Sequence, residues 1–468
     1  MQYFKKNINL FIVIILFIIL CVSYILIIPV FEAPDENWHF MYAFYISKYN
    51  KTTSTYNENI SSEQYIKEHV QDGQDPTIFM DDKYMLYNFP GEGYIQHVTS
   101  RLHPTTYYFI SAQIIKPFGV DSIDAEYDYK NFWQPNLYIN NKILKDSNPT
   151  KFLVLILRLF QIVYGVLVII FIYKIIKLLS NDKFENKSII LLSGIAFLPQ
   201  FVFLCSYINN DVLSALFGLI SAYFTALLFK RDKAYLGLLS VLFAFIGGFT
   251  KYTILIMVPV VVIAFLIWLV IKKKKWALIS VSIITFLTIA VFYYVIFSIR
   301  KNPPILLDRI ISTSKEMLAG LRDGKGISYI NIPALTQIFK STVAIFGSMS
   351  IYADKFIYNF FLAYVVSGIL LFFIKIKEYR NSKKSIIFII ISIISIFSYF
   401  LLYNFYANWG QNQGRVILMA VFLTYILAIL GFRSIKASYR NILYYGLFSC
   451  SLFISVFCLY NYIYLKYY

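Results

Sequence analysis

The chain has 468 residues, of which 59% are hydrophobic and 15% are charged, and its mean hydropathy is +0.63. Soluble domains average roughly 45–50% apolar and about 25% charged residues, so this composition excludes a disordered chain and an ordinary soluble enzyme. In a soluble protein the net charge of +18 would indicate nucleic acid. In this chain the charge follows membrane topology, and we expect no nucleic-acid partner.

Apolar runs of the length that an α-helix needs to cross about 30 Å of hydrocarbon recur along the whole chain. We therefore predict an all-α polytopic membrane protein with about eleven transmembrane helices, the fifth and sixth of which meet at Lys251. The predicted spans are Ile8–Val30, Phe152–Leu179, Ser188–Tyr207, Val212–Phe229, Tyr235–Phe249, Thr253–Ile271, Trp276–Ser298, Phe356–Ile374, Ser385–Tyr403, Val416–Phe432 and Asn441–Tyr464.

The loops on the two sides of these spans differ in charge. If the N-terminus is cytoplasmic, the inward loops hold 21 Lys and Arg residues against four acidic residues, and the other 21 acids fall outside. Cytoplasmic loops are enriched in Lys and Arg, so we predict an N-in, C-out protein of the plasma membrane. Its basic inner loops would contact the anionic lipid bilayer.

The predicted organisation has two long outward connections. It consists of a first transmembrane helix at 1–30, a large extracytoplasmic loop at 31–151, transmembrane helices two to seven at 152–299, a second long outer loop at 300–355, and helices eight to eleven at 356–468. Inside the first loop, Pro34–Tyr49 and His103–Gly119 are too short to span, and we expect helices lying in the membrane interface. Gly119–Thr150 is a candidate external cap.

The segment "APDENWHF" (Ala33–Phe40) places two adjacent carboxylates, Asp35 and Glu36, directly after the first span. If Pro34 is the first helical residue, Asp35 and His39 share one helix face at the membrane surface. Charged groups so close to hydrocarbon usually imply pairing or function, although acids in a first helical turn are also favoured by the helix dipole. Asp-x-x-x-His could chelate a metal, but no second cluster with metal spacing follows, and we name no metal ligand.

Two further motifs lie at predicted outer ends of helices. In "LHPTTYYF", His103 either forms a helix-entry turn or lies near the first acidic pair. Span three ends at Asn209-Asn210-Asp211, and span four begins at once. Asp211 is either an N-cap or a second acid that faces the first across an outer cleft.

Three cations lie at outer helix ends, against the positive-inside trend. They are Arg158, Lys251 and Arg415, the last within "NQGRV" after Gln413. Any one of them could snorkel to the interface. Together, beside a loop that carries 16 of the 25 acidic residues, they indicate a receptor for an anionic group such as phosphate.

The motifs "APDENWHFMYAFYIS", "HPTTYYFISA", "LRLFQIVYG", "FLPQFVFLCSYINNDVLSALF", "GGFTKYTILIMVPV" and "NQGRVILMAVF" resemble, in this order, those of DUF2142, a family of bacterial membrane proteins grouped with the GT-C-fold glycosyltransferases. The first is also similar to the Asp-Glu motif of protein O-mannosyltransferases, and "FTKYTILIMVP" to the Lys segment of aminoarabinose transferases. The chain departs from the usual forms at Thr105 and Val416, and neither change removes a charge.

This resemblance implies a GT-C-like bundle that transfers a sugar from a polyprenyl-phosphate-linked donor to a cell-envelope acceptor (polysaccharide, teichoic acid, glycolipid or protein), with inversion at the anomeric centre. It implies Asp35 as the general base and Glu36 as its partner or alternate. Some relatives use a divalent cation such as Mg or Mn and others use none, and the residues do not decide between them. The implied substrate contacts are His39, His103, Arg158, Asn210, Asp211, Lys251, Gln413 and Arg415.

Two other classes of function stay open at the level of the sequence. A lipid-linked oligosaccharide polymerase, ligase or flippase would share the anionic lipid and the large outer loop, although the apolar span centres disfavour a flippase. A non-catalytic membrane protein that binds an envelope polymer would have no requirement for Asp35.

Overall fold

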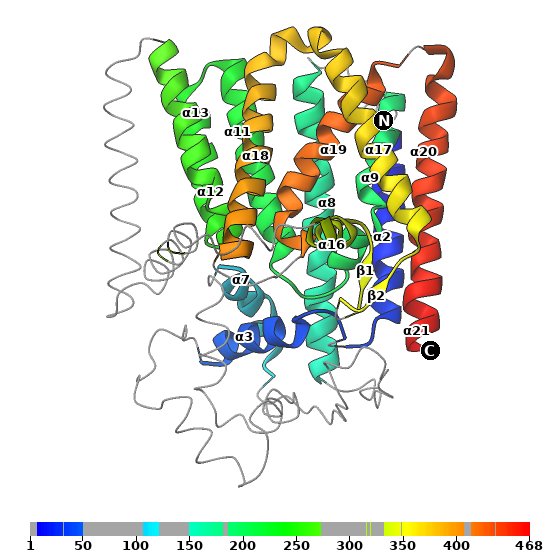
Figure 1. Cartoon of the computed structure of the whole chain (residues 1–468). Helices are drawn as coiled ribbons and strands as arrows, with labels where there is room; N and C mark the ends of the chain where they lie inside the picture. The colour runs from blue at the N-terminus through cyan, green and yellow to red at the C-terminus, as the bar shows by residue number, and fades with distance from the viewer. Residues whose placement is uncertain are drawn as a thin grey trace.

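The computed structural model of the chain describes residues 7–30, 32–49, 106–120, 149–180, 186–272, 332–347, 349–406, 413–435 and 437–468, with the isolated positions Lys315 and Ala319 (Figure 1). Three predictions fall outside the described residues: the seventh span Trp276–Ser298, the site residue His103, and nearly all of the candidate cap at Gly119–Thr150.

In the described part of the chain, 8 helical segments are long and apolar enough to cross a membrane. They confirm the polytopic helical class, whereas the count of eleven stays a prediction. The helices that carry these segments are α2 (Ile8–Ile27), α8 (Pro149–Leu179), α11 (Asp211–Arg231), α13 (Met257–Ile271) with the preceding η6 (Tyr252–Ile254), α17 (Lys355–Ile374), α18 (Lys383–Tyr406) with η8 (Ile376–Ser382), α19 (Leu418–Arg433) with η9 (Gly414–Ile417), and α20 (Ala437–Cys458) with η10 (Leu459–Tyr464) and α21 (Leu465–Tyr467).

The prediction of one continuous span over Ser188–Tyr207 is wrong. The chain there forms η5 (Asn186–Leu192), α9 (Ser193–Ala196) and α10 (Pro199–Leu204). Pro199 has no N–H to continue the helix and disfavours the helical conformation in the residue before it, and Leu198 is extended at ψ 117°. Residues 188–212 are nonetheless buried, so the broken run lies inside the bundle.

The predicted fifth and sixth spans do meet at Lys251. α12 (Ala234–Gly248) is apolar but shorter than the spanning helices, and the chain turns through Lys251 into η6 and α13. α11 packs against both α8 and α12. Buried hydroxyls of Ser221, Thr225 and Ser240 hydrogen-bond between α11 and α12, as polar groups between membrane helices commonly do.

Each predicted interfacial segment, Pro34–Tyr49 and His103–Gly119, contains a helix. α3 (Glu36–Tyr49) packs against α7 (Thr106–Ile115), which continues into η4 (Lys116–Phe118). One small departure from an all-α fold is an antiparallel hairpin of β1 (Ile345–Phe346) and β2 (Ile351–Tyr352), which follows α16 (Ile332–Val343). Figure 1 shows α3, α7, α16 and the hairpin gathered toward one end of the bundle.

The cations predicted to be cytoplasmic lie at the other end. Lys230 and Arg231 end α11, Lys272 follows α13, and Lys375 follows α17. In Figure 1 these helix ends lie opposite the end that carries α3 and α7. The charge asymmetry of the sequence therefore corresponds to the two ends of one bundle, while the direction in which the bundle crosses the membrane stays a prediction.

Candidate functional site

The turn that joins α2 to α3 places two neighbouring acids in different environments. α3 begins at Glu36, and Asp35 precedes it in the left-handed conformation at φ 60°. The prediction that Pro34 starts the helix is therefore wrong. A non-glycine residue with positive φ is uncommon and concentrates at functional positions, which makes Asp35 a residue that its surroundings hold in place.

Glu36 is fully buried and pairs with Arg158 of α8. The Arg158 Nε and Nη2 atoms donate to the two carboxylate oxygens of Glu36 at 2.7 and 2.6 Å, and the two side chains are 3% and 0% exposed. Glu36 also accepts a hydrogen bond from the backbone N–H of Ile208 at 3.1 Å. The remaining guanidinium donors reach the carbonyl oxygens of Ile28 and Pro29 at 2.7 and 2.9 Å. This pair joins the end of α2, the start of α3, α8 and the segment before α11.

Asp35, in the same turn, is half-exposed and pairs with Arg415. Its carboxylate accepts a hydrogen bond from Arg415 Nη2 at 2.5 Å, and the Asp35 side chain is 48% exposed while that of Arg415 is 9% exposed. Arg415 Nε donates to Gln413 Oε1 at 2.7 Å, which fixes the plane of the guanidinium. Half of Asp35 therefore stays accessible to a reactant while Arg415 balances its charge.

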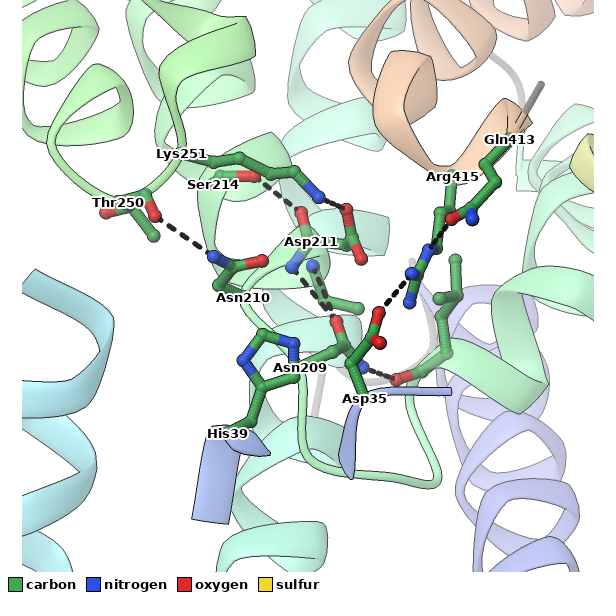
Figure 2. A network of polar contacts seen from close by, with 12 residues as sticks. Asp35, His39, Asn209, Asn210, Asp211, Ser214, Thr250, Lys251, Gln413 and Arg415 are labelled. Atoms are coloured by element: carbon green, nitrogen blue, oxygen red, sulfur yellow. Dashed lines mark hydrogen bonds and ion pairs between the residues drawn. The ribbon is translucent and has the colours of Figure 1, made fainter. Parts of the chain in front are cut away.

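Asp211 and Lys251 form a third pair beside the second one. The Lys251 ammonium contacts Asp211 Oδ1, with side-chain exposures of 13% and 1%. Figure 2 shows the side chains of Asp35, Asp211, Lys251 and Arg415 converging from four different parts of the chain. Burial lowers the pKa of Lys251, and the Asp211 carboxylate opposes that shift.

The start of α11 is capped by a residue that the sequence analysis did not single out. Asn209 Oδ1 accepts the backbone N–H groups of Asp211 and Val212 at 3.0 and 3.3 Å. The alternative of Asp211 as the N-cap is therefore wrong, because Asp211 is the first helical residue and its side chain pairs with Lys251. An Asx residue two positions before a helix was a signal that could have found Asn209.

Two oxygens in this cluster have no hydrogen-bond donor among the residues that the structure describes. They are Asn210 Oδ1 and Asp211 Oδ2, both buried. The amide nitrogen of Asn210, by contrast, donates to the Thr250 carbonyl at 3.4 Å. A buried acceptor without a donor costs roughly 1–3 kcal/mol, so these oxygens are suited to receive hydroxyl or ammonium hydrogens from a ligand.

His39 rises from α3 toward the same cluster (Figure 2). Its Nδ1 lies 2.8 Å from the Tyr108 hydroxyl, and the two rings stack with centroids 5.7 Å apart. Burial raises the pKa of Tyr108, so the phenol stays protonated and can donate to Nδ1. The proton of a neutral His39 would then reside on Nε2. Sequence reasoning missed Tyr108, although it stands in the quoted segment "HPTTYYF".

The described residues do not offer a ready metal centre. No group of three or more His, Cys, Asp or Glu side chains in this part of the chain could hold a metal ion. Asp35 and Asp211, the two carboxylates that converge, each face a cation. The donor set as arranged does not fit a divalent ion, and no chemical step below is routed through one.

One family model matches part of the chain. Residues 151–298 match the family model described as dolichyl-phosphate-mannose-protein mannosyltransferase. That segment contains Arg158, Asn210, Asp211 and Lys251, and it excludes Asp35 and everything beyond residue 298. No curated protein matches the chain at a significant level.

Remote fold resemblances connect the chain to an oligosaccharyltransferase of Archaeoglobus fulgidus. The apo form is 12% identical, with 99% of this chain and 56% of that chain covered and a TM-score of 0.43. The complex with an inhibitory peptide and a dolichol-phosphate is 14% identical, with 99% and 55% covered and a TM-score of 0.43. The complex with Zn and sulfate is 13% identical, with 78% and 43% covered and a TM-score of 0.41. The chain thus spans about half the length of these structures.

The chain is a multi-pass membrane protein, and the family match supports the GT-C class of membrane glycosyltransferases. Membership of DUF2142 within that class stays a prediction. Of the predicted site residues that the structure describes, it brings Asp35, His39, Asn210, Asp211, Lys251, Gln413 and Arg415 into one cluster. It places Glu36 and Arg158 in a separate buried pair.

Proposed function

We propose that the chain is a membrane glycosyltransferase that transfers a sugar from a polyprenyl-phosphate donor to an extracytoplasmic acceptor, with Asp35 as the general base. The observation that carries the proposal is the half-exposed Asp35 carboxylate, held at positive φ and facing Arg415 beside the Lys251–Asp211 pair. The match of residues 151–298 to a mannosyltransferase family supports it.

The proposed reaction is a single displacement. The acceptor hydroxyl gives its proton to Asp35 as its oxygen bonds to the anomeric carbon, and the bond from that carbon to the phosphate oxygen breaks. The polyprenyl phosphate leaves with one more negative charge, while Asp35 loses one on protonation. The total charge of the site is conserved, and the anomeric centre is inverted.

Arg415 is suited to follow this movement of negative charge. Its Nη2 donates to the Asp35 carboxylate. When the donor phosphate enters, Arg415 turns toward it and Asp35 accepts the proton of the acceptor hydroxyl. A guanidinium can bind a phosphate through two donors, which stabilises the departing group more than a single contact would. Lys251 is the second cation within reach of the cluster.

We assign Glu36 and Arg158 a different role from the one that the sequence resemblance implied. Every oxygen of Glu36 and several donors of Arg158 are already engaged in the buried pair. They are therefore positioning residues, which fix the turn that presents Asp35. The donor phosphate would contact Arg415 and Lys251 rather than Arg158.

The unpartnered oxygens of Asn210 and Asp211 would accept hydroxyl hydrogens of the transferred sugar. His39, with a proton on Nε2, would donate to the sugar or the acceptor from the opposite side. His103 stays a proposed substrate contact on the strength of the family resemblance alone.

The acceptor would be a cell-envelope glycan, glycolipid or protein, and the reaction would occur on the outer face of the plasma membrane. The separation of the site from Lys230, Lys272 and Lys375 by the length of the bundle supports that orientation. Labelling of a cysteine placed at Asp211 from the cytoplasmic side alone would contradict it.

The proposal is tested with purified protein in nanodiscs, given radiolabelled undecaprenyl-phosphate sugars and cell-envelope fractions as acceptors. Label should move to the acceptor with wild-type protein and with Glu378→Gln, an exposed acid far from the site, and not with Asp35→Asn. Transfer that survives in Asp35→Asn would contradict the assigned base. Retention of label on the lipid in every case, with binding of the envelope fraction, would favour a non-catalytic polymer-binding protein.

A further inference from the structure

The backbone directly before Arg415 is held by α16, an element outside the cluster of charges. The N–H of Gly414 donates to Ser341 Oγ at 2.6 Å, and both residues are buried. A Cβ at position 414 would lie 2.5 Å from the Ile338 carbonyl oxygen and 2.8 Å from the Thr342 backbone nitrogen. Only glycine permits this approach of η9 to α16.

The C-terminal end of α16 is itself fixed to the bundle. The N–H of Ile345 donates to Gln200 Oε1 at 2.8 Å, and the Tyr358 hydroxyl donates to the Ala344 carbonyl at 2.7 Å. Gln200 belongs to α10, and Tyr358 belongs to α17. Ser341 therefore presents its hydroxyl from a rigid support rather than from a free helix end.

The contact lies one residue away from the guanidinium that pairs with Asp35. Gln413 holds the Nε atom of Arg415 on one side of Gly414, and Ser341 holds the amide of Gly414 itself. Together they fix both the backbone and the side-chain plane of Arg415. Each residue of the Gln413-Gly414-Arg415 motif therefore has its own role. Gln413 orients the Arg415 side chain, Gly414 allows the close approach to α16, and Arg415 pairs with Asp35.

We propose that Ser341 and Gly414 are positioning residues for the reaction: their hydrogen bond, the Ser341–Gly414 latch, sets the reach of Arg415 toward Asp35 and the lipid phosphate. The inference rests on the proposed function and adds residues that touch no reactant. Through α16, which lies within the predicted second outer loop at 300–355, it also links that loop to the donor site.

The test measures binding of undecaprenyl phosphate to the full chain in nanodiscs, together with hydrogen exchange of the segment 413–417. Ser341→Ala should speed exchange of the Gly414 amide and weaken lipid-phosphate binding by roughly 2- to 10-fold, the range that the loss of one neutral hydrogen bond gives. Gly414→Ala should weaken binding further. Thr342→Ala should not rescue it, because removing the Thr342 Cγ2, the nearest atom, leaves the clash with the Ile338 carbonyl oxygen and the Thr342 backbone nitrogen. Gly446→Ala is the matched control, since its Cβ would meet nothing within 4 Å.

A double-mutant cycle distinguishes the loss of Arg415 positioning from a non-specific effect of Ser341→Ala on packing. In an Arg415→Gln background, Ser341→Ala should have no further effect on lipid-phosphate binding, because the group that it positions is gone. Additive losses, or Ser341→Ala that binds as well as wild type while Arg415→Gln does not, would overturn the latch. If Arg415→Gln itself binds undecaprenyl phosphate as wild type does, the proposed function has failed at its donor contact, whatever exchange at Gly414 shows.

Discussion

Asp35 and Glu36 are adjacent in the chain, carry the same charge and each pair with an arginine, yet their environments are opposite. The Glu36–Arg158 pair is saturated with hydrogen bonds and has no exposure beyond 3%, whereas the side chain of Asp35 is 48% exposed against Arg415. A buried pair held by this many hydrogen bonds is costly to break, and its burial keeps a substrate away from it. Neighbouring charges in one motif thus divide into a structural and a reactive role according to their exposure.

The largest effect on activity is expected at Asp35. Asp35→Asn preserves the shape of the side chain and removes the basic oxygen, so transfer should fall by about 10²- to 10⁴-fold. Single-turnover rates in nanodiscs measure this loss, and the unfolding temperature should stay close to that of wild type because the site is half-exposed. A loss with Glu36→Gln and none with Asp35→Asn would exchange the two roles.

The largest effect on stability is expected at the buried pair. Arg158→Met leaves Glu36 buried without its partner and should lower the free energy of unfolding by about 3–5 kcal/mol. Denaturation of the purified protein in detergent measures the change. Lys375→Met is the control. Lys375 Nζ lies 3.7 Å from Glu378 Oε1, and both side chains are about half exposed. Such surface ion pairs contribute about 0–1 kcal/mol to the free energy of unfolding. Equal stability of the two variants would contradict the structural role of Arg158.

A smaller effect on donor binding is expected at Arg415. A charge-assisted hydrogen bond contributes about 1.5–3 kcal/mol, so Arg415→Ala should weaken lipid-donor affinity by roughly 10- to 150-fold. Arg415→Lys should recover only part of it, since lysine keeps the charge and loses the two-pronged geometry. The apparent affinity for the acceptor, measured in the same nanodiscs, should change little. An unchanged donor affinity would mean that Arg415 serves only to hold Asp35.

The smallest effect is a displacement of the alkaline limb of the pH profile. Burial lowers the pKa of Lys251, so its ammonium loses its proton at a lower pH than an ordinary lysine does. Donor affinity should accordingly fall as the pH rises toward that pKa, before exposed lysines titrate. Lys251→Arg, which stays protonated, should move the fall to higher pH. An identical alkaline limb in both proteins would show that Lys251 does not contact the donor.

Some residues of the candidate site were predictable because charged side chains are rare next to the apolar spans of a membrane protein. Asp35, Asp211, Lys251 and Arg415 were identified by their position at helix ends next to hydrocarbon, where an ionised group needs a partner. Which of these charges pair with one another could not be predicted from the sequence, because Arg415 is 380 residues from Asp35 along the chain. The positioning role of Ser341 and the capping role of Asn209 were not predicted for a simpler reason. A serine inside a helix and an asparagine before one are common, and their roles depend on what packs against them.

Hydropathy along the chain is enough to predict a polytopic helical membrane protein, because a helix that crosses hydrocarbon must satisfy its backbone internally and present apolar side chains over a fixed length. The same pattern predicts the positions of α8, α11, α13, α17 and α19 to within a few residues, and the turn at Lys251. Three features came from the folded structure: the break at Pro199 in the run before Tyr207, the positive φ of Asp35 before α3, and the pairing of each cation with its acid. These features depend on contacts between helices that are distant in sequence, and no local pattern of hydropathy encodes them.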